Sequence, residues 1–305
     1  LTYSQVWEAL KIVDLDPANS SNVLLVYGWE NGSDGDVTND RSRNKNSNGG
    51  AVGDWNREHV FAQSLGNPDL GSSGPGADAQ MLRSSDVQRN GTRGNRLFAS
   101  GSGINSFTVG TNGWYPGNEW KGDVARIVMY MYLRYGSQCL PTYVTIGSTN
   151  ATDSNMVDLL LQWNSEDPVS QYEDNRNTYL GNASNTYGQG NRNPFIDNPY
   201  LATVIWGGPV AENRWPAIFL SAEDFVSVEN ATVYPNPAIN NEVYVSTATE
   251  LKSIVLYNIN GQIIQEIKNP SKVNDAYKVS DLPKGFYLMQ LATENASTTK
   301  KIIVN

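Results

Sequence analysis

The sequence is short of the residues that most metal and disulfide frameworks need. Its 305 residues hold one cysteine, Cys139, and one histidine, His59. A single cysteine excludes an intrachain disulfide, and with a single histidine it also excludes zinc sites built from several Cys and His ligands. No apolar run approaches the ~20 residues that a membrane helix needs, so we expect no membrane span. The sequence begins without Met or a charged and apolar leader, as expected of a mature form whose signal peptide has been removed.

Positive charge is also scarce, and its position carries more information than its amount. The net charge of −9 argues against nucleic-acid binding, because an acidic protein repels the phosphate backbone. Basic residues nevertheless outnumber acidic ones between residues 41 and 96, so the rest of the chain is more acidic than the total suggests. The cations of this window are Arg41, Arg43, Lys45, Arg57, Arg83, Arg89, Arg93 and Arg96.

Composition divides the chain into two parts. All 8 Trp precede residue 216, and every basic residue beyond 222 is a Lys. We therefore expect a first domain over 1–222, a linker over 223–232 and a second domain over 233–305. The tail contains short alternating strands, with a hairpin turn at Asn260-Gly261, and predicts a small β-sandwich. The first domain mixes loops with helices, two of them expected over 120–135 and 153–163, so the fold class is α+β with a mainly helical first domain.

The surroundings of His59 point to chemistry on phosphodiesters. A histidine can act as a base near neutral pH, and the adjacent Glu58 offers a hard oxygen ligand for a divalent cation. Arginines nearby can contact phosphate in a planar, bidentate manner. Neighbouring residues in a regular strand face opposite sides, so Glu58 and His59 can share a site only at a strand end or bend. The alternative is a hydrogen-bonded histidine with a structural role.

Two other readings compete with this one. Asp34, Asp36 and Asp40 resemble part of a calcium loop, although Lys45 stands where such a loop needs a bidentate Glu; a solvated loop is the alternative. A secreted glycan-active or glycan-binding protein is the second functional hypothesis, since the 8 Trp and 16 Tyr could stack on sugars. Its acid and base would come from Glu119, Asp123, Asp167 or Glu173.

Several motifs in order resemble the bacterial endonuclease I family. They are Trp55-Asn56-Arg57-Glu58-His59-Val60, Asp78, Leu82-Arg83, Ser85-Asp86, Asn90-Gly91-x-Arg93-Gly94-Asn95, Lys121-Gly122-Asp123-Val124-Ala125-Arg126, Leu160-x-x-Trp163, Asp167-Pro168-Val169, Glu173-x-x-Arg176-Asn177 and the run 189–197. The resemblance covers about residues 1–215. It implies a ββα-metal (His-Me) finger in a secreted or periplasmic nuclease without sequence specificity.

The same resemblance implies a role for individual residues. His59 becomes the general base, and Glu58 and Asn90 the metal ligands, with Asn95 as the alternative to Asn90 and otherwise a substrate contact. The metal would be Mg²⁺, with Mn²⁺ and Ca²⁺ as alternatives. Phosphate contacts would come from the catalytic Arg93 and from Arg57 and Arg83. The alternative interpretation of these three arginines is that they form structural ion pairs.

The implied reaction is hydrolysis of DNA, and also of RNA, by one metal ion and a histidine base, leaving 5′-phosphate ends. An inactive nuclease fold used for binding is the remaining alternative. The sequence departs from many relatives at Gln80-Met81, where they carry histidine. This leaves His59 as the single imidazole.

The tail resembles the type IX secretion sorting domain. The resemblance rests on Val233-Tyr234-Pro235-Asn236-Pro237, Tyr257-Asn258-x-Asn260-Gly261, Leu282-Pro283-Lys284-Gly285-Phe286-Tyr287 and Lys300-Lys301-Ile302-Ile303-Val304. It implies export across the outer membrane of a Gram-negative bacterium by the type IX machinery, to the medium or the cell surface. A carbohydrate-binding sandwich is the alternative.

Overall fold

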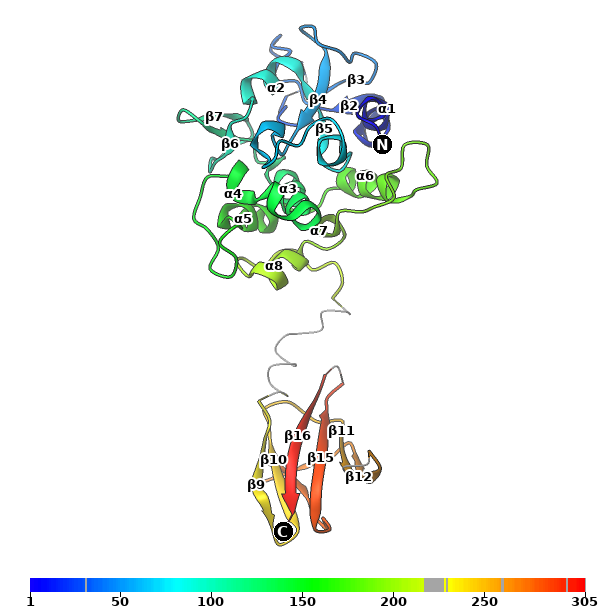
Figure 1. The fold of residues 1–305 in the computed structure, drawn as a ribbon, viewed down its shortest axis with the longest axis vertical. Coiled ribbons are helices and arrows are strands. Elements are labelled where there is room, and N and C mark those ends of the chain that lie inside the picture. The colour runs from blue at the N-terminus through cyan, green and yellow to red at the C-terminus, as the bar shows by residue number, and fades with distance from the viewer. Residues whose placement is uncertain (31, 217–227, 229, 259–260, 295, 305) are drawn as a thin grey trace. The chain divides into compact units, whose positions relative to one another are not determined.

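The computed structural model describes the whole chain except residues 31, 217–227, 229, 259–260, 295 and 305. It divides into two units, Leu1–Arg214 and Trp215–Asn305 (Figure 1). Most of the expected linker over 223–232, and the expected boundary at 222, lie outside the described residues, and the first strand of the second unit begins at Thr232. No helix among the described residues has the length and apolar character required to span a bilayer.

The N-terminal unit is a mixed α/β fold. Its helices are α1 (Tyr3–Val13), α2 (Val87–Arg93), α3 (Lys121–Tyr135), α4 (Pro141–Val144), α5 (Asp158–Glu166), α6 (Gln171–Gly181), α7 (Pro194–Asp197) and α8 (Tyr200–Trp206). Short 3₁₀ turns lie at Gln63–Leu65, Gly74–Ala77 and Gly136–Cys139. The helix expected over 120–135 is confirmed as α3, and the one expected over 153–163 begins later, at Asp158.

Three small sheets complete this unit. The first is β1 (Leu15–Asp16), β2 (Asn19–Leu24) and β3 (Ser42–Asn44); the second is β4 (Trp55–His59) with β5 (Leu82–Asp86); the third is β6 (Leu97–Phe98), β8 (Gly113–Tyr115) and β7 (Phe107–Val109). Helix α3 packs against α5 and α7 (Figure 1) and is buried over most of its length. Trp55, Trp114 and Trp120 are among the largest fully buried side chains.

Buried arginine–carboxylate pairs tie these elements together. Arg83 of β5 donates to Asp123 of α3 at 2.9 Å, and Arg126 of α3 pairs with Glu173 of α6 at 2.7 Å. Such pairs fix the relative positions of the elements that they join, because removing one partner leaves an uncompensated buried charge. Arg83 is only 1% exposed and its ring neighbours are Trp120 and Tyr172. The phosphate contact predicted for Arg83 is therefore wrong, and the alternative, a structural ion pair, is what the structure shows.

From Thr232 onward the described residues of the C-terminal unit form β-strands and turns, as expected, but the strands are not split into two separate sheets. The strands are β9 (Thr232–Ile239), β10 (Glu242–Ser246), β11 (Ser253–Asn258), β12 (Ile263–Lys268), β13 (Lys272–Val273), β14 (Ala276–Val279), β15 (Gly285–Ala292) and β16 (Ser297–Val304). They form one sheet in the order β12-β11-β15-β16-β9-β10-β14-β13.

The last strand makes this sheet continuous. β16 pairs with β15 along its whole length and meets β9 in parallel at Val304 and Ala238. The two halves share one hydrophobic cluster, with Val245, Leu256 and Met289 fully buried in it. The sheet therefore curls around its own core, and this corrects the predicted sandwich. The hairpin of β11 and β12 is present, although Asn260 lies outside the described residues.

Candidate active site

A ββα unit carries most of the predicted site residues. β4 runs antiparallel to β5, with Glu58 opposite Arg83 and His59 opposite Leu82. Helix α2 follows β5 directly, because the Asp86 carboxylate caps it by accepting from the backbone N–H groups of Gln88 and Arg89, both at 2.8 Å. The helix thereby folds back against β4, and this is the arrangement that a ββα finger requires.

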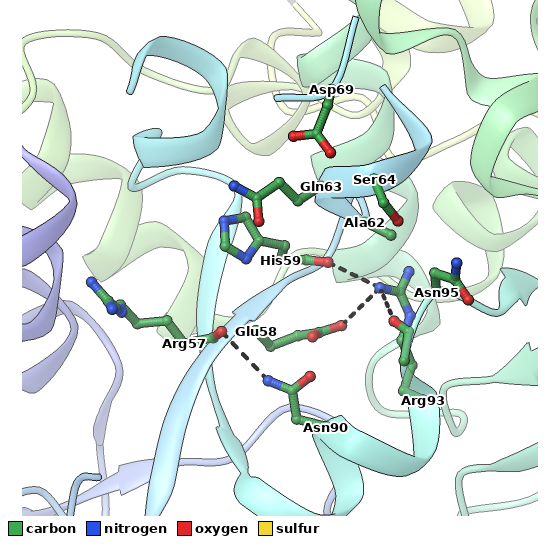
Figure 2. A pocket seen from close by; sticks show the side chains of 11 residues that line it. Arg57, Glu58, His59, Ala62, Gln63, Ser64, Asp69, Asn90, Arg93 and Asn95 are labelled. Carbon is green, nitrogen blue, oxygen red and sulfur yellow. Dashed lines mark hydrogen bonds and ion pairs between the residues drawn. The ribbon is translucent and has the colours of Figure 1, made fainter. Parts of the chain in front are cut away.

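One polar cavity of about 440 Å³ opens beside this unit (Figure 2). Its lining includes every predicted site residue except Arg83. His59 is the last residue of β4, so Glu58 and His59 reach the same cavity from a strand end, as expected. The lining residues are Arg57, Glu58, His59, Ala62, Gln63, Ser64, Asp69, Asn90, Arg93, Gly94 and Asn95.

Glu58 is a buried carboxylate with one engaged oxygen. Its side chain is 2% exposed, and Oε1 accepts from the Tyr27 hydroxyl at 2.8 Å and lies 3.2 Å from an Arg93 nitrogen. Burial raises the pKa of Glu58 to about 7, against the lowering influence of Arg93 and of the Tyr27 hydrogen bond. A cation near the second oxygen would stabilise the charged form.

Arg93 lines the cavity beside this carboxylate. It is 1% exposed, and its guanidinium donates to the backbone carbonyls of His59 at 3.0 Å and Val60 at 2.8 Å. These bonds fix the end of β4 and hold a positive charge beside Glu58. The predicted role of Arg93 as a catalytic phosphate contact stays a prediction: most of its donors bond to backbone carbonyls, but the residue lines the cavity and its Nε has no hydrogen-bond partner among the described residues.

The His59 ring is held in one tautomer. Its Nε2 lies 3.0 Å from the Gly76 carbonyl oxygen, which can only accept, so Nε2 carries the proton and Nδ1 carries the lone pair. The ring also stacks on Tyr3, with the centroids 5.7 Å apart. Burial lowers the pKa of His59, so the neutral form that can accept a proton is favoured near neutral pH.

Asn90 and Asn95 lie on different sides of Arg93. The Asn90 amide nitrogen donates to Asn56 Oδ1 at 2.8 Å, and this turns the amide oxygen away from Asn56 and toward the Glu58 side of the cavity (Figure 2). Asn95 follows the end of α2 and is exposed, with Arg93 between it and Glu58 in the same view. This geometry favours Asn90 over Asn95 as the partner of Glu58.

Arg57 lies at the rim of the cavity in an aromatic cradle. Its guanidinium carbon is 3.5 Å from the centre of the Tyr3 ring and 4.4 Å from that of Trp7, and it donates to the Tyr3 carbonyl. Burial lowers the pKa of Arg57. Two aromatic rings of α1 thus hold the Arg57 cation at the cavity, where a phosphate could reach it.

Comparison with known proteins decides the family. Residues 1–200 match the Endonuclease I family, about two thirds of the chain. The chain belongs to the endonuclease I family. It is 44% identical over 214 residues to a protein named extracellular ribonuclease from Bacillus amyloliquefaciens, covering 68% of each chain. It is 43% identical over 217 residues to a protein of the same name from Bacillus subtilis, covering 68% of this chain and 69% of the relative.

The second unit also matches a known family. Residues 232–305 match the secretion system C-terminal sorting domain, so this endonuclease I family nuclease is a secreted protein of the type IX route. A solved structure of PorZ, a surface component of the type IX secretion system of Porphyromonas gingivalis, covers 28% of this chain and 13% of its own length. Its TM-score is 0.23 at 13% identity, too low to carry an argument.

The acidic residues considered for glycan chemistry form structural ion pairs and hydrogen bonds in this nuclease. Glu119 pairs with Arg41 at 2.6 Å, Asp123 with Arg83, and Glu173 with Arg126. Asp167 accepts from the backbone N–H of Gly122 at 2.8 Å. The family membership and these contacts leave the glycan hypothesis without support. In the segment that resembles a calcium loop, Asp34 and Asp36 accept from groups within residues 36–39.

Sequence reasoning missed the residues that support the site. Tyr27, Gly76 and Tyr3 come from segments with no chemical motif, and each reaches the site through tertiary packing. Tyr3 and Trp7 had a usable signal, since residues four apart on a helix share a face. Their contact with Arg57 arises from tertiary packing alone.

Proposed function

We propose that the chain is a sequence-non-specific endonuclease that hydrolyses phosphodiester bonds of DNA and RNA and leaves 5′-phosphate ends. In this proposal His59 is the general base, and Glu58 and Asn90 hold one divalent cation. The observation that carries it is the convergence of these three side chains on one cavity of a ββα unit. The relatives named extracellular ribonucleases support RNA as one of the substrates.

The base acts through Nδ1. Because Nε2–H stays with the Gly76 carbonyl, an attacking water can deliver its proton to Nδ1 only. The resulting imidazolium keeps its Nε2 hydrogen bond, so the ring need not turn during the reaction. A positioned general base contributes a factor of roughly 10²–10⁴ to the rate.

The oxygen donors of the site fit Mg²⁺. Within the described part of the chain, no contact engages Glu58 Oε2 or Asn90 Oδ1, and both belong to residues that line the cavity. The described residues hold no group of three or more His, Cys, Asp or Glu side chains suited to a metal. One carboxylate and one amide suit Mg²⁺, which keeps several waters; Mn²⁺ and Ca²⁺ also take oxygen ligands. When bound, the cation would offset the negative charge of the phosphate and of the leaving oxygen.

Unpaired cations surround the same unit and supply the phosphate contacts. Among the described residues of the N-terminal unit, most Lys and Arg side chains form ion pairs with carboxylates. The cations of this unit without a carboxylate within ion-pair distance all lie between residues 45 and 96. These cations are Lys45, Arg57, Arg89 and Arg96. Contacts between such cations and phosphates form with the nucleic-acid backbone and do not depend on the base sequence.

The test is cleavage of plasmid DNA and of a structured RNA by the full chain, with Mg²⁺ and with EDTA. We expect cleavage that EDTA abolishes and that His59→Ala lowers by at least about 100-fold without loss of fold. Glu58→Ala should lose activity that excess Mg²⁺ partly restores. End-labelling should find 5′-phosphates. Cleavage that survives either EDTA or His59→Ala would refute this proposal.

The proposed partner of residues 232–305 is the type IX secretion machinery, since this segment matches a secretion sorting domain. In a host with that machinery, a chain truncated at residue 231 should stay inside the cell envelope while the full chain reaches the medium or the cell surface. Export of the truncated chain would contradict it.

A further inference from the structure

The direction of the His59 ring depends on one backbone carbonyl. Gly76 O lies in the 3₁₀ turn Gly74–Ala77 and accepts the hydrogen bond of His59 Nε2, at 3.0 Å. Gly76 has no side chain to anchor it, and a Cβ there would lie 1.8 Å from the Gly71 carbonyl oxygen. The carbonyl can therefore be held in place only through the backbone on either side of it.

Asp78, two residues further on, fastens that backbone to the protein interior. Its side chain is 2% exposed, and Oδ2 accepts from the hydroxyls of Tyr130 at 2.8 Å and Tyr135 at 2.7 Å, both on α3. Oδ1 accepts from the backbone N–H of Gln80 at 2.9 Å and from Gln189 Nε2 at 2.8 Å. A buried carboxylate is stable only with such donors.

The backbone of Asp78 extends this anchorage back into the turn. Its N–H donates to the Pro75 carbonyl at 3.3 Å, which closes the turn that contains Gly76. Its carbonyl accepts from the N–H groups of Met81 and Leu82, both at 3.1 Å, at the start of β5. One residue therefore joins α3, the 189–191 segment, the 3₁₀ turn and the second strand of the ββα unit.

We propose that Asp78 is a positioning residue of the nuclease: through the turn it holds the Gly76 carbonyl against Nε2 of His59, and so keeps Nδ1 as the basic nitrogen that faces the cavity. This rests on the proposed role of His59 as the base. Asp78 does not line the cavity, so its action on the reaction passes through Gly76. Tyr130 and Tyr135 of α3 contribute to this positioning, because their hydroxyls donate to the Asp78 carboxylate.

The single histidine makes the proposal directly measurable. In protein labelled with ¹⁵N-histidine, one pair of ring nitrogens reports on His59, and their shifts at a fixed pH of 8 show which nitrogen carries the proton. We expect the Nε2–H tautomer alone in the wild type. Asp78→Asn should give a mixture of both tautomers, and kcat on plasmid DNA should fall about tenfold with KM little changed, since part of the base contribution is lost.

A milder variant and a control variant distinguish a loss of His59 positioning from a general loss of protein stability. Tyr135→Phe removes one donor to Asp78 with little change in packing, so it should show the same tautomer shift in smaller measure even where Asp78→Asn fails to fold. Glu173→Gln neutralises another buried carboxylate, whose hydrogen bonds run to Arg126 and Ser170 and not to the turn. It should lower the melting temperature but leave the His59 shifts and the kcat of the folded protein unchanged.

Two results would overturn the proposal. The first is a single Nε2–H tautomer with unchanged kcat in Asp78→Asn and Tyr135→Phe. The second is a change of the His59 signals in Glu173→Gln as large as in Asp78→Asn, which would indicate general loosening. Failure of the proposed function is a separate result, because it would show as full activity in His59→Ala.

Discussion

The Tyr27 hydroxyl donates to Glu58 Oε1 at 2.8 Å, and both side chains are buried. Tyr27 directly follows the segment Leu24–Val26, which is buried in the core, and has a positive φ of 76°. This backbone turn aims the ring at Glu58 from a segment outside the ββα unit. The position of the predicted metal ligand is thus set by a residue 31 positions away in sequence.

Removing this hydroxyl should weaken metal binding more than it weakens the fold. Supporting hydrogen bonds to metal ligands are typically worth 10–100-fold in metal affinity. We expect Tyr27→Phe to raise the Mg²⁺ concentration needed for half-maximal cleavage by about tenfold, with near-normal activity at saturation. The control is Tyr115→Phe, whose hydroxyl bonds to Asn118 away from the cavity. An unchanged Mg²⁺ dependence in Tyr27→Phe would contradict the prediction.

The choice between the two asparagines can be tested directly. Asn90→Ala should lower cleavage by about 100-fold or more, and excess Mg²⁺ or Mn²⁺ should restore part of it, since a ligand oxygen is lost. Asn95→Ala should change cleavage by less than about threefold, because Asn95 is exposed and lies beyond Arg93. The measurement is initial cleavage rate against metal concentration for both variants. The reverse order of effects would make Asn95 the ligand.

The unpaired cations should determine the salt dependence of substrate binding. Each phosphate contact released changes the slope of log K against log salt by about 0.9 on duplex DNA. Arg57→Ala and Arg96→Ala should each reduce this slope by roughly that amount, measured by binding of labelled duplex to the His59→Ala protein. Arg192→Ala serves as the control, because Arg192 is paired with Asp197. Equal slopes in all three variants would remove these arginines from the interface.

Asp167 should make the nuclease unit less stable as pH rises. Burial raises its pKa to about 6, above the value of about 3.9 in an unfolded chain. The folded state therefore binds the proton more tightly, and this stabilisation is complete below about pH 4 and is lost as the pH rises through about 6. Relative to the wild type, Asp167→Asn should gain about 1–3 kcal/mol between pH 4 and pH 7.

Urea unfolding followed by Trp fluorescence measures this effect in the full chain, since no Trp lies beyond residue 215. Glu166→Gln is a control of opposite sign, because the hydrogen bond from Lys121 lowers the pKa of Glu166. It should lose stability relative to the wild type as the pH rises. Parallel stability curves for Asp167→Asn and the wild type would show that Asp167 is not shifted upward.

The sequence by itself indicated the residues that we propose carry the chemistry, and determined several of the local elements that hold them. Glu58, His59 and Asn90 were recognisable because a motif keeps them at fixed spacing, and the strand-end position followed from the two-residue period of a strand. The helix over 120–135 and the β11–β12 hairpin followed from local periodicity and turn residues. Such features depend on residues that are close in sequence, so the sequence alone is enough to predict them.

Tertiary structure decided what those residues touch. Arg83 and Arg93 are predicted phosphate contacts by type and position, yet one pairs with Asp123 and the other holds the end of β4, because burial makes a paired guanidinium the stable form. The tail predicts strands, but one sheet in place of two arises from the contact of β16 with β9. The tautomer of His59 depends on Gly76, and the charge of Glu58 on Tyr27 and Arg93. These partners are distant in sequence, and only the folded chain brings them within hydrogen-bond distance.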